Sequence, residues 1–565
     1  QKYFITKIKE CRLCRHSGHQ LSWWYMTFKI MHRNNNLWRV NMKFKNLSKI
    51  LTATIATAML ITACGNKVDN NSTGETSAQS DSFIYGIAGD PGNSVNVITT
   101  SDRYGLMTIK ALYSPLYMYN ADGINYFLAE SMTPSEDNLT YTAKLRKDVK
   151  LSDGEPFTAD DVVFTYEEML KEENAGWAYS QLIFNGKPLK IEKVDDYTVN
   201  FILPEVSAPA MELLANIFIM PKHVYEGETN FENSEKNATP VGTGPYKLAE
   251  YKAGQYVKFE KNENYFLGKA NIKNVIFRII PDANTAKLAL QKGEINALSV
   301  QSSDLSDLTK GDNLTPYKYD EGRVAYVVIN SNSKKLQDKK VRQAIFYGMN
   351  RTDLINAAFG SKEYAEKAYT FLPNGNPFHT DDVEQYNFDQ EKAKKLLEEA
   401  GVTNLTVKFG YTSNDVPSQK EATIIQQNLK AIGINVELAG QEGTALSQQM
   451  LNEESDYDMF IGGYIMGIDP DTFNSLFTLD SKYNYSHYKD KEIDDLFNAG
   501  RVETDEAKRV EIYNKIQQKL QDNAYFYPML ENKRIVVMSS NVTGVDEAKL
   551  VPVYTFEDMS KLSFK

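Results

Sequence analysis

The chain has 565 residues, of which 42% are hydrophobic and 24% charged, and it carries a formal net charge of −11. This composition is ordinary for a globular protein, and a chain of this length needs two or three lobes, each with its own core. Residues 1–63 hold 11 Lys or Arg and one Glu, so the remainder has a net charge of −21. Such an acidic body would be repelled by polyanions, which argues against nucleic acid as a partner.

Residues 1–41 fit poorly with the rest of the chain. The chain begins with Gln, and a secretory signal would start naturally at Met42. Cys11 and Cys14, with His16 and His19 close by, have a spacing that can bind zinc, which leaves a small metal site as the alternative. We interpret this stretch as extra upstream sequence that arises from a start codon placed too early.

Residues 42–63 have the three parts of a secretory signal. Lys43, Lys45 and Lys49 precede the apolar segment 50–61, and small residues follow it before Cys64. The segment is shorter than the roughly 20 apolar residues that span a bilayer. A cysteine just after the cut resembles a bacterial lipoprotein signal, in which the thiol takes up a lipid. A poor transmembrane helix or a chance cysteine is the alternative.

Residues 64–82 are rich in Asn, Ser, Thr and Gly and have little to bury. Such a segment is expected to be a flexible tether. It would let the folded body stand away from the membrane while the lipid on Cys64 holds the protein there.

The folded body starts near Phe83 and alternates short strands with helices. Residues 139–145 and 197–203 alternate apolar and polar side chains, which predicts half-buried strands. Thr158 and Asp161 form the pattern of a capping box at the start of a helix. Helical spacing recurs over 341–348 and 393–400, and Gly401 then supplies a left-handed C-cap.

One stretch predicts a complete strand–helix–strand unit. Residues 405–409 and 434–438 alternate as strands, and between them Ile425, Leu429 and Ile432 share one face of a helix that ends at Gly433. The two strands would be parallel with a right-handed crossover, and open sheets of this kind bind ligands beyond the carboxyl ends of their strands. A second strand, 456–463, runs directly into the loop 464–471, which we predict to face a ligand.

The sequence contains no catalytic motif that we can identify. It has no Gly-x-Ser-x-Gly, no His-Glu-x-x-His and no Gly-rich loop that ends in Gly-Lys-Ser/Thr. Residues 242–245 are Gly-Thr-Gly-Pro, which we interpret as a rigid turn. After residue 63 the histidines are His223, His379 and His487, which could meet in a metal or catalytic site only through folding. We therefore expect that the protein is not an enzyme and that it binds neither a cofactor nor a metal.

Several segments resemble the family 5 extracellular solute-binding proteins, which are the oligopeptide, dipeptide and nickel receptors of ABC importers. Residues 141–163, YTAKLRKDVKLSDGEPFTADDVV, are similar to the best-known signature of that family. Further similarities, in family order, lie at 240–246 (PVGTGPY), 292–296 (KGEIN), 325–351 with its VRQAI helix, 388–401 (FDQEKAKKLLEEAG) and 431–436. Together they cover nearly all of residues 83–560.

The resemblance implies an α/β, two-lobed fold like that of periplasmic binding proteins, of type II in its large variant with an extra subdomain. Lobe I would comprise residues 83–323 and 529–565, with a subdomain inserted at roughly 105–235. Lobe II would comprise 324–528. The two crossings between them would form a hinge, and the lobes would close on a ligand.

The resemblance also implies cleft residues in the loop that starts at Tyr464. In several peptide receptors an aspartate just after this aromatic binds the ligand's α-amino group, whereas here the matching place holds Met466 or Gly467 and the nearest acid is Asp469. Asp469 could hold the amine, the amine could be held elsewhere, or the ligand could be something other than a free peptide. An acid before Pro-Asp is also common in a plain turn. Weaker candidates are Arg323 and Tyr326 at the first crossing, and Asn93, Asn96 and Tyr104 near the first strand.

These implications combine into one functional hypothesis. The protein would be a monomeric lipoprotein outside the cytoplasmic membrane that captures short peptides and delivers them to an ABC permease. A receptor for nickel chelates or another small solute, and a receptor for peptide pheromones, are the alternatives. A surface hydrolase is a contrasting class that no residue spacing favours.

Overall fold

The computed structural model describes residues 81–92, 95–100, 102–174, 178–184 and 186–565. These residues all lie in one compact unit of the chain, residues 79–565. The predicted upstream extension, the signal and the lipidation site Cys64 lie outside the described residues, as do Asn93 and all but the last two positions of the predicted tether.

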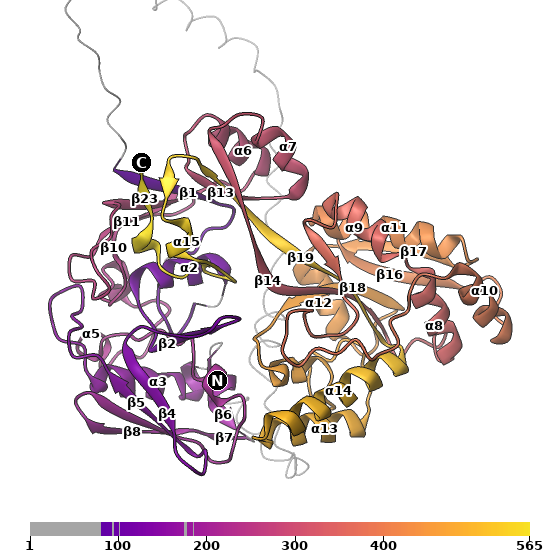
Figure 1. The fold of residues 1–565 in the computed structure, drawn as a ribbon, viewed down its shortest axis with the longest axis horizontal. Helices are drawn as coiled ribbons and strands as arrows, with labels where there is room; N and C mark the ends of the chain where they lie inside the picture. Colours follow the sequence, from indigo (N-terminus) through magenta and orange to yellow (C-terminus); the bar gives the residue numbers. More distant parts are fainter. Residues whose placement is uncertain (1–80, 93–94, 101, 175–177, 185) are drawn as a thin grey trace, which may run out of the picture. The chain divides into compact units, whose positions relative to one another are not determined.

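An 11-stranded sheet organises the described residues (Figure 1). Its strand order is β10-β11-β12-β1-β13-β19-β14-β18-β16-β17, and β15 pairs with β19 beside this path. In chain order its strands are β1 (Ser82–Ile87), β10 (Tyr246–Lys252), β11 (Tyr256–Lys261), β12 (Asn274–Ile279), β13 (Ala297–Val300), β14 (Leu314–Ile329), β15 (Ala365–Lys367), β16 (Thr406–Thr412), β17 (Asn435–Gln441), β18 (Met459–Ile465) and β19 (Phe526–Ser539).

The long strands β14 and β19 belong to both halves of this sheet. We call the half formed by β10, β11, β12, β1 and β13, with its surroundings, the first lobe, and the half formed by β18, β16 and β17 the second lobe. Along β14, Leu314 to Asp320 pair with one end of β19 and Val324 to Val328 with the other, and the register shifts between these two runs. The sheet therefore passes from one lobe to the other through two adjacent strands.

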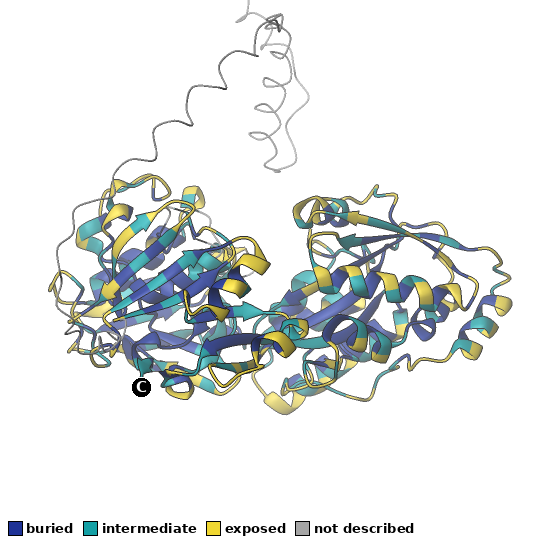
Figure 2. Ribbon diagram, turned by 90° about the horizontal axis from the view of Figure 1, so that it is seen from above, coloured by how far each residue is buried: buried dark blue, intermediate teal, exposed yellow. Residues whose placement is uncertain are grey.

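The central strands of the sheet have runs in which every residue is buried, whereas the outer strands β11, β12 and β17 alternate between buried and more exposed residues (Figure 2). On β14, Val324, Tyr326 and Val328 belong to one core cluster, whereas Ala325, Val327 and Ile329 belong to another. Because successive side chains of a strand point to opposite faces, a strand that is covered on both sides must be apolar throughout. The run 324–329 meets this requirement.

Smaller sheets surround the large one. The strands β4 (Ala129–Pro134), β5 (Thr140–Leu145), β9 (Thr198–Ile202) and β8 (Lys190–Asp195) form a four-stranded sheet in that order. The paired strands are β2 (Tyr117–Asn120) with β3 (Gly123–Tyr126), β6 (Ile183–Phe184) with β7 (Lys187–Pro188), β20 (Val542–Thr543) with β23 (Ser563–Phe564), and β21 (Leu550–Val551) with β22 (Thr555–Phe556). The four-stranded sheet falls within the predicted inserted subdomain, whose boundaries remain a prediction.

The α-helices are α2 (Arg103–Leu112), α3 (Ala159–Met169), α4 (Ala210–Leu213), α5 (Lys222–Tyr225), α6 (Ala283–Gln291), α7 (Leu305–Leu308), α8 (Lys339–Gly348), α9 (Arg351–Phe359), α10 (Gln390–Glu399), α11 (Val416–Lys430), α12 (Gly443–Leu451), α13 (Lys491–Val502), α14 (Glu506–Asn523) and α15 (Val545–Ala548). Short 3-10 helices occur at η1 (Glu172–Asn174), η2 (Tyr179–Leu182), η3 (Glu235–Ala238), η4 (Ser302–Asp304), η5 (Pro470–Leu476) and η6 (Met559–Lys561).

Most of the local predictions are confirmed. Thr158 and Asp161 form the expected capping box at the start of α3. Strands β16 and β17 are parallel, and α11 connects them, as the predicted strand–helix–strand unit requires. Gly401 has a φ of 65°, the left-handed conformation expected just after α10.

The predicted strand 456–463 is displaced along the chain. Strand β18 begins at Met459, and the carboxylate of the preceding Asp458 accepts hydrogen bonds from the Lys408 N–H and the Ser333 hydroxyl. It continues to Ile465, which pairs with Arg323 of β14. The prediction that the loop begins at Tyr464 was therefore wrong, because pairing with β14 draws this residue into the strand.

Candidate functional site

The sheet topology places a crevice where β14 and β19 pass between the lobes. In the first lobe β13 ends at Val300, which pairs with Ile535 of β19. In the second lobe β18 runs parallel to β16 and ends at Ile465, beside Arg323. The carboxyl ends of strands from both lobes thus point at the short crossing that comprises residues 319–324 and 531–534, where open α/β sheets bind ligands.

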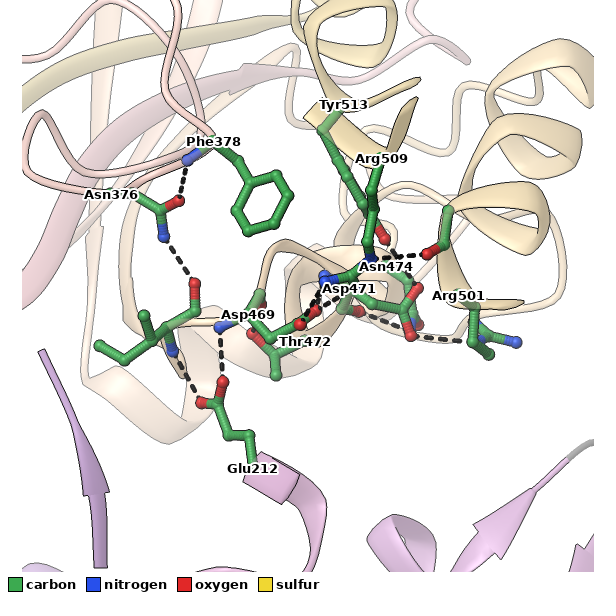
Figure 3. A network of polar contacts seen from close by, with 12 residues as sticks. Glu212, Asn376, Phe378, Asp469, Asp471, Thr472, Asn474, Arg501, Arg509 and Tyr513 are labelled. Carbon is green, nitrogen blue, oxygen red and sulfur yellow. Dashed lines mark hydrogen bonds and ion pairs between the residues drawn. The ribbon is translucent and has the colours of Figure 1, made fainter. Parts of the chain in front are cut away.

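Asp469 stands at the end of the loop that follows β18, where it is the N-cap of η5 and accepts a hydrogen bond from the Asp471 N–H. Both of its carboxylate oxygens also accept hydrogen bonds from Arg509 of α14, each at 2.6 Å (Figure 3). The two side chains are only 7% (Arg509) and 11% (Asp469) exposed. A buried bidentate pair of this kind fixes the loop to α14 with defined geometry.

A second acid–base pair lies beside the first. The Asp471 carboxylate accepts a hydrogen bond from Arg501 Nε at 2.9 Å, and its backbone carbonyl accepts one from the Asn474 amide. Burial raises the pKa of Asp471, although the Arg501 guanidinium opposes the shift. The carboxylates of Asp469 and Asp471 balance the guanidiniums of Arg509 and Arg501 in charge, so these two pairs hold the loop in place without a net charge.

Glu212 of α4 binds the same loop from the first lobe. Its carboxylate accepts hydrogen bonds from the N–H groups of Ile468 and Asp469, the former at 2.7 Å (Figure 3). A Cβ atom placed on Gly467 would lie 1.7 Å from Glu212 Oε1, so only glycine permits this approach. Nearby, the Ala208 N–H donates to the Arg501 carbonyl at 2.7 Å. The segment 208–212 therefore bridges the two lobes.

The carboxyl group of Glu212 has an unusual acidity. Burial raises its pKa to about 7, the two N–H groups oppose the shift, and the charge of Asp469 adds to it. The charges of Glu212, Asp469 and Arg509 also act on the pKa of the neighbouring Tyr119. Protonation of a bridge between lobes can therefore occur near neutral pH.

Tyr464 and Tyr326, two of the predicted ligand residues, lie in an aromatic core. Their ring centroids are 5.4 Å apart, and Tyr326 also contacts the ring of Phe526 at 4.8 Å. The Tyr464 hydroxyl donates to the Phe371 carbonyl, and Met466 packs against the same cluster. In this conformation the three side chains support the loop, and their contact with a ligand stays a prediction.

The other predicted residues are spread over the crossing and the first lobe. Arg323 Nη1 donates to Asn532 Oδ1 at 2.9 Å, and a Cβ on Gly463 would lie 2.3 Å from Arg323 Nη2. Asn96 is 1% exposed, and its side chain bonds Asn237 and the Ile98 N–H, as expected for a structural role. The Tyr104 ring lies against Gly89, near the end of β1. The ligand roles of these residues also stay predictions.

Glu212, Arg509 and Arg501 were missed by reasoning from the sequence. Glu212 lies in a four-residue helix without a motif, and the two arginines lie on α13 and α14 among many surface charges. Only the fold brings them to the loop. Apart from the glycine at 467, the sequence therefore holds no signal that indicates these three residues.

The described residues contain neither a metal-binding cluster nor a membrane-spanning helix. Within them, no group of three or more His, Cys, Asp or Glu side chains could hold a metal ion. Among the helices of the same residues, none combines the length and the hydrophobicity that a membrane crossing requires.

Comparison with known proteins places this architecture in a family. The profile of the bacterial extracellular solute-binding proteins, family 5, matches residues 123–486. The oligopeptide-binding protein AppA of Bacillus subtilis is 30% identical over 532 residues, which cover 88% of this chain and 96% of that protein. The members of this family are binding proteins that act outside the cytoplasm.

Solved structures agree with this assignment. The ABC transporter substrate-binding protein CtaP of Listeria monocytogenes has 41% identity and a TM-score of 0.83, with coverage of 86% of this chain and 99% of that one. The structure of AppA of Bacillus subtilis in complex with a nonapeptide has 28% identity and a TM-score of 0.71, with coverage of 86% and 99%. The chain belongs to the family 5 bacterial extracellular solute-binding proteins.

Proposed function

We propose that this protein is the substrate-binding component of an ABC importer, and that it captures short peptides and delivers them to a membrane permease. The family assignment and the peptide-binding relatives support this proposal. The structural observation that carries it is the crossing of β14 and β19, toward which the carboxyl ends of strands from both lobes point. A ligand at this crossing can be enclosed when the lobes close.

The bridge between the lobes gives this closure a physical basis. The Glu212 carboxylate on α4 and the Ala208 N–H reach groups of the second lobe, and such bonds can form only while the lobes are together. A ligand that contacts both lobes would shift the protein toward this closed state by its difference in affinity for the open and closed forms. Uptake itself would draw its energy from the transporter, so the bound peptide would leave unaltered and no covalent chemistry would take place.

The lipid anchor belongs to the same proposal. The sequence around Cys64 supports a lipidated N-terminus, with residues 65–82 as the tether and the protein as a monomer on the outer face of the cytoplasmic membrane. Mass spectrometry of the protein from a membrane fraction would test this point. A diacylglyceryl group on Cys64 is expected, and an unmodified cysteine or retained upstream residues would contradict it.

The decisive test of the ligand is to identify what accompanies the protein. The full chain would be purified under native conditions, and native mass spectrometry would measure the mass of the bound molecules before and after denaturation. Short peptides are the expected result. A nickel chelate, haem or a sugar in place of peptides would overturn the assignment of the substrate.

A further inference from the structure

A cluster of charged side chains at the crossing has no part in the loop network described above. Its centre is Glu321 of β14, whose side chain is 4% exposed. Arg103, the first residue of α2, donates to Glu321 through Nη1 at 2.8 Å and through Nη2 at 3.3 Å. Arg103 thus satisfies both oxygens of this carboxylate in a bidentate pair.

Arg534 of β19 is the second cation of the cluster. Its Nη1 lies 3.6 Å from Glu321 Oε2, which is beyond hydrogen-bond distance. Within the described residues its guanidinium makes no hydrogen bond, and its buried Nε atom has no partner. A guanidinium has five N–H donors, and buried donors without acceptors are costly, so Arg534 is poised for an acceptor from elsewhere.

The neighbour of Arg534 in the sheet also has an unused polar group. Tyr319 pairs with Arg534 across β14 and β19, and the side chain of Arg534 is 26% exposed. Tyr319 itself is 8% exposed, and its buried hydroxyl has no hydrogen-bond partner within the described residues. Two adjacent residues therefore present unsatisfied donors at the point where the carboxyl ends of β13 and β18 converge.

The charges of the cluster do not balance. Arg103 and Arg534 contribute two positive charges and Glu321 one negative charge. The nearest other acid on the strand, Asp320, is 77% exposed and lies 3.7 Å from Lys533. The cluster thus has a surplus of one positive charge, opposite in sign to the net charge of −11 of the whole chain. It would attract an anion into the crevice.

We propose that Arg534, with the Tyr319 hydroxyl and Arg103 beside it, forms a subsite for a carboxylate of the bound ligand. The subsite rests on the proposed function, because it treats the ligand as a peptide. Guanidinium and carboxylate match in geometry and charge, and a phenol hydroxyl adds a donor to the same oxygen. The carboxylate would belong either to the C-terminus of the peptide or to an acidic side chain.

Three pools of peptides of four to nine residues would distinguish these sources. The first pool has a free C-terminus and one central Gln, the second has the same sequences with a C-terminal amide, and the third has the amide and a central Glu. Native mass spectrometry of the full chain would measure the relative affinity for each pool. We expect at least one carboxylate pool to bind roughly tenfold more tightly than the amidated Gln pool, in the range of a charge-assisted bond.

Variants connect this preference to the subsite. Arg534→Gln is expected to remove the preference for the carboxylate pools, whereas Arg534→Lys should restore part of it. Tyr319→Phe should reduce it by less. The matched control is Arg278→Gln on β12, where Arg278 makes an exposed pair with Glu294 at 3.3 Å, and it should have no effect.

The outcomes separate this proposal from the function on which it rests. If all three pools bind equally well to the wild-type protein, the carboxylate subsite is wrong while peptide capture stands. If no pool binds, the proposed function itself fails. A preference that survives Arg534→Gln unchanged would also overturn the subsite, and the wild-type comparison remains decisive even if a variant does not fold.

Discussion

The pair formed by Asp469 and Arg509 allows a quantitative prediction. The side chains are 11% and 7% exposed, and both oxygens of Asp469 bind Arg509 at 2.6 Å. Removal of one partner from a buried pair costs about 3–5 kcal/mol, because the other charge stays buried without compensation. Two features moderate the loss in Asp469→Asn: Arg509 Nε still donates to the Gly500 carbonyl at 2.7 Å, and asparagine is also a good N-cap.

We therefore expect Asp469→Asn to lower the free energy of unfolding by about 3 kcal/mol, at the lower end of that range. Urea denaturation followed by intrinsic fluorescence would measure it. The matched control is Asp495→Asn on α13, whose partner Lys491 and whose own side chain are 78% and 58% exposed, and it should cost less than about 1 kcal/mol. A loss in Asp469→Asn no larger than in this control would show that the buried pair does not stabilise the fold.

The same variant tests the predicted role of Asp469 toward an α-amino group. Peptides with a free amine and their N-acetylated forms would be titrated against the wild-type protein and Asp469→Asn. A selective loss for the free amines would establish the role. An equal loss for both forms would leave Asp469 as a residue that positions the loop through Arg509.

Three further perturbations follow from the same contacts. Burial raises the pKa of Glu421 to about 7, so the folded state binds a proton more tightly than the unfolded chain does, and stability falls as pH rises from about 4.5 through 7. Glu421→Gln should therefore stabilise the protein at pH 8 by up to about 3 kcal/mol and have no such effect at pH 4. An equal effect of this substitution at both pH values would contradict the expectation. Burial between the lobes raises the pKa of Glu212 to about 7, and we expect opening to return it to water and to an ordinary pKa, so that closure takes up a proton. Peptide affinity should then be about tenfold higher at pH 5.5 than at pH 8. Glu212→Gln should flatten this dependence, and the exposed Glu232→Gln should not. A Cβ on Gly244 would lie 2.5 Å from the Ala111 carbonyl oxygen, so Gly244→Ala should lower the thermal midpoint, whereas Gly311→Ala, which meets nothing within 4 Å, should leave it unchanged.

Local structure was largely predictable from the sequence, because it depends on neighbouring residues. The capping box at Thr158, the helix that ends before Gly401 and the parallel pair of β16 and β17 all follow from spacing within some 35 residues. The glycines of 242–245, which predicted a rigid turn, lie against the backbone of residues 111–113. Periodicity and turn chemistry determine such features.

The arrangement between distant segments could not be predicted in this way. The pairing of Tyr319 with Arg534 joins strands that lie more than 200 residues apart, and Glu212 meets Ile468 across a similar separation. The resemblance to a family implied two crossings, but it did not indicate that Arg534 has unused donors there. The packing of Tyr464 was also not predictable: its side chain is 8% exposed and lies against the ring of Phe473, while its contact with a ligand stays a prediction.

The proposed function requires that the two lobes enclose a peptide at the crossing of β14 and β19 and release it unchanged. Small-angle scattering of the purified protein, with and without a saturating peptide pool, would test it most directly, together with the mass of the peptide recovered afterwards. We expect a smaller radius of gyration with peptide and recovery of the same peptide masses. An unchanged radius with every pool, or a peptide recovered as cleaved product, would contradict it.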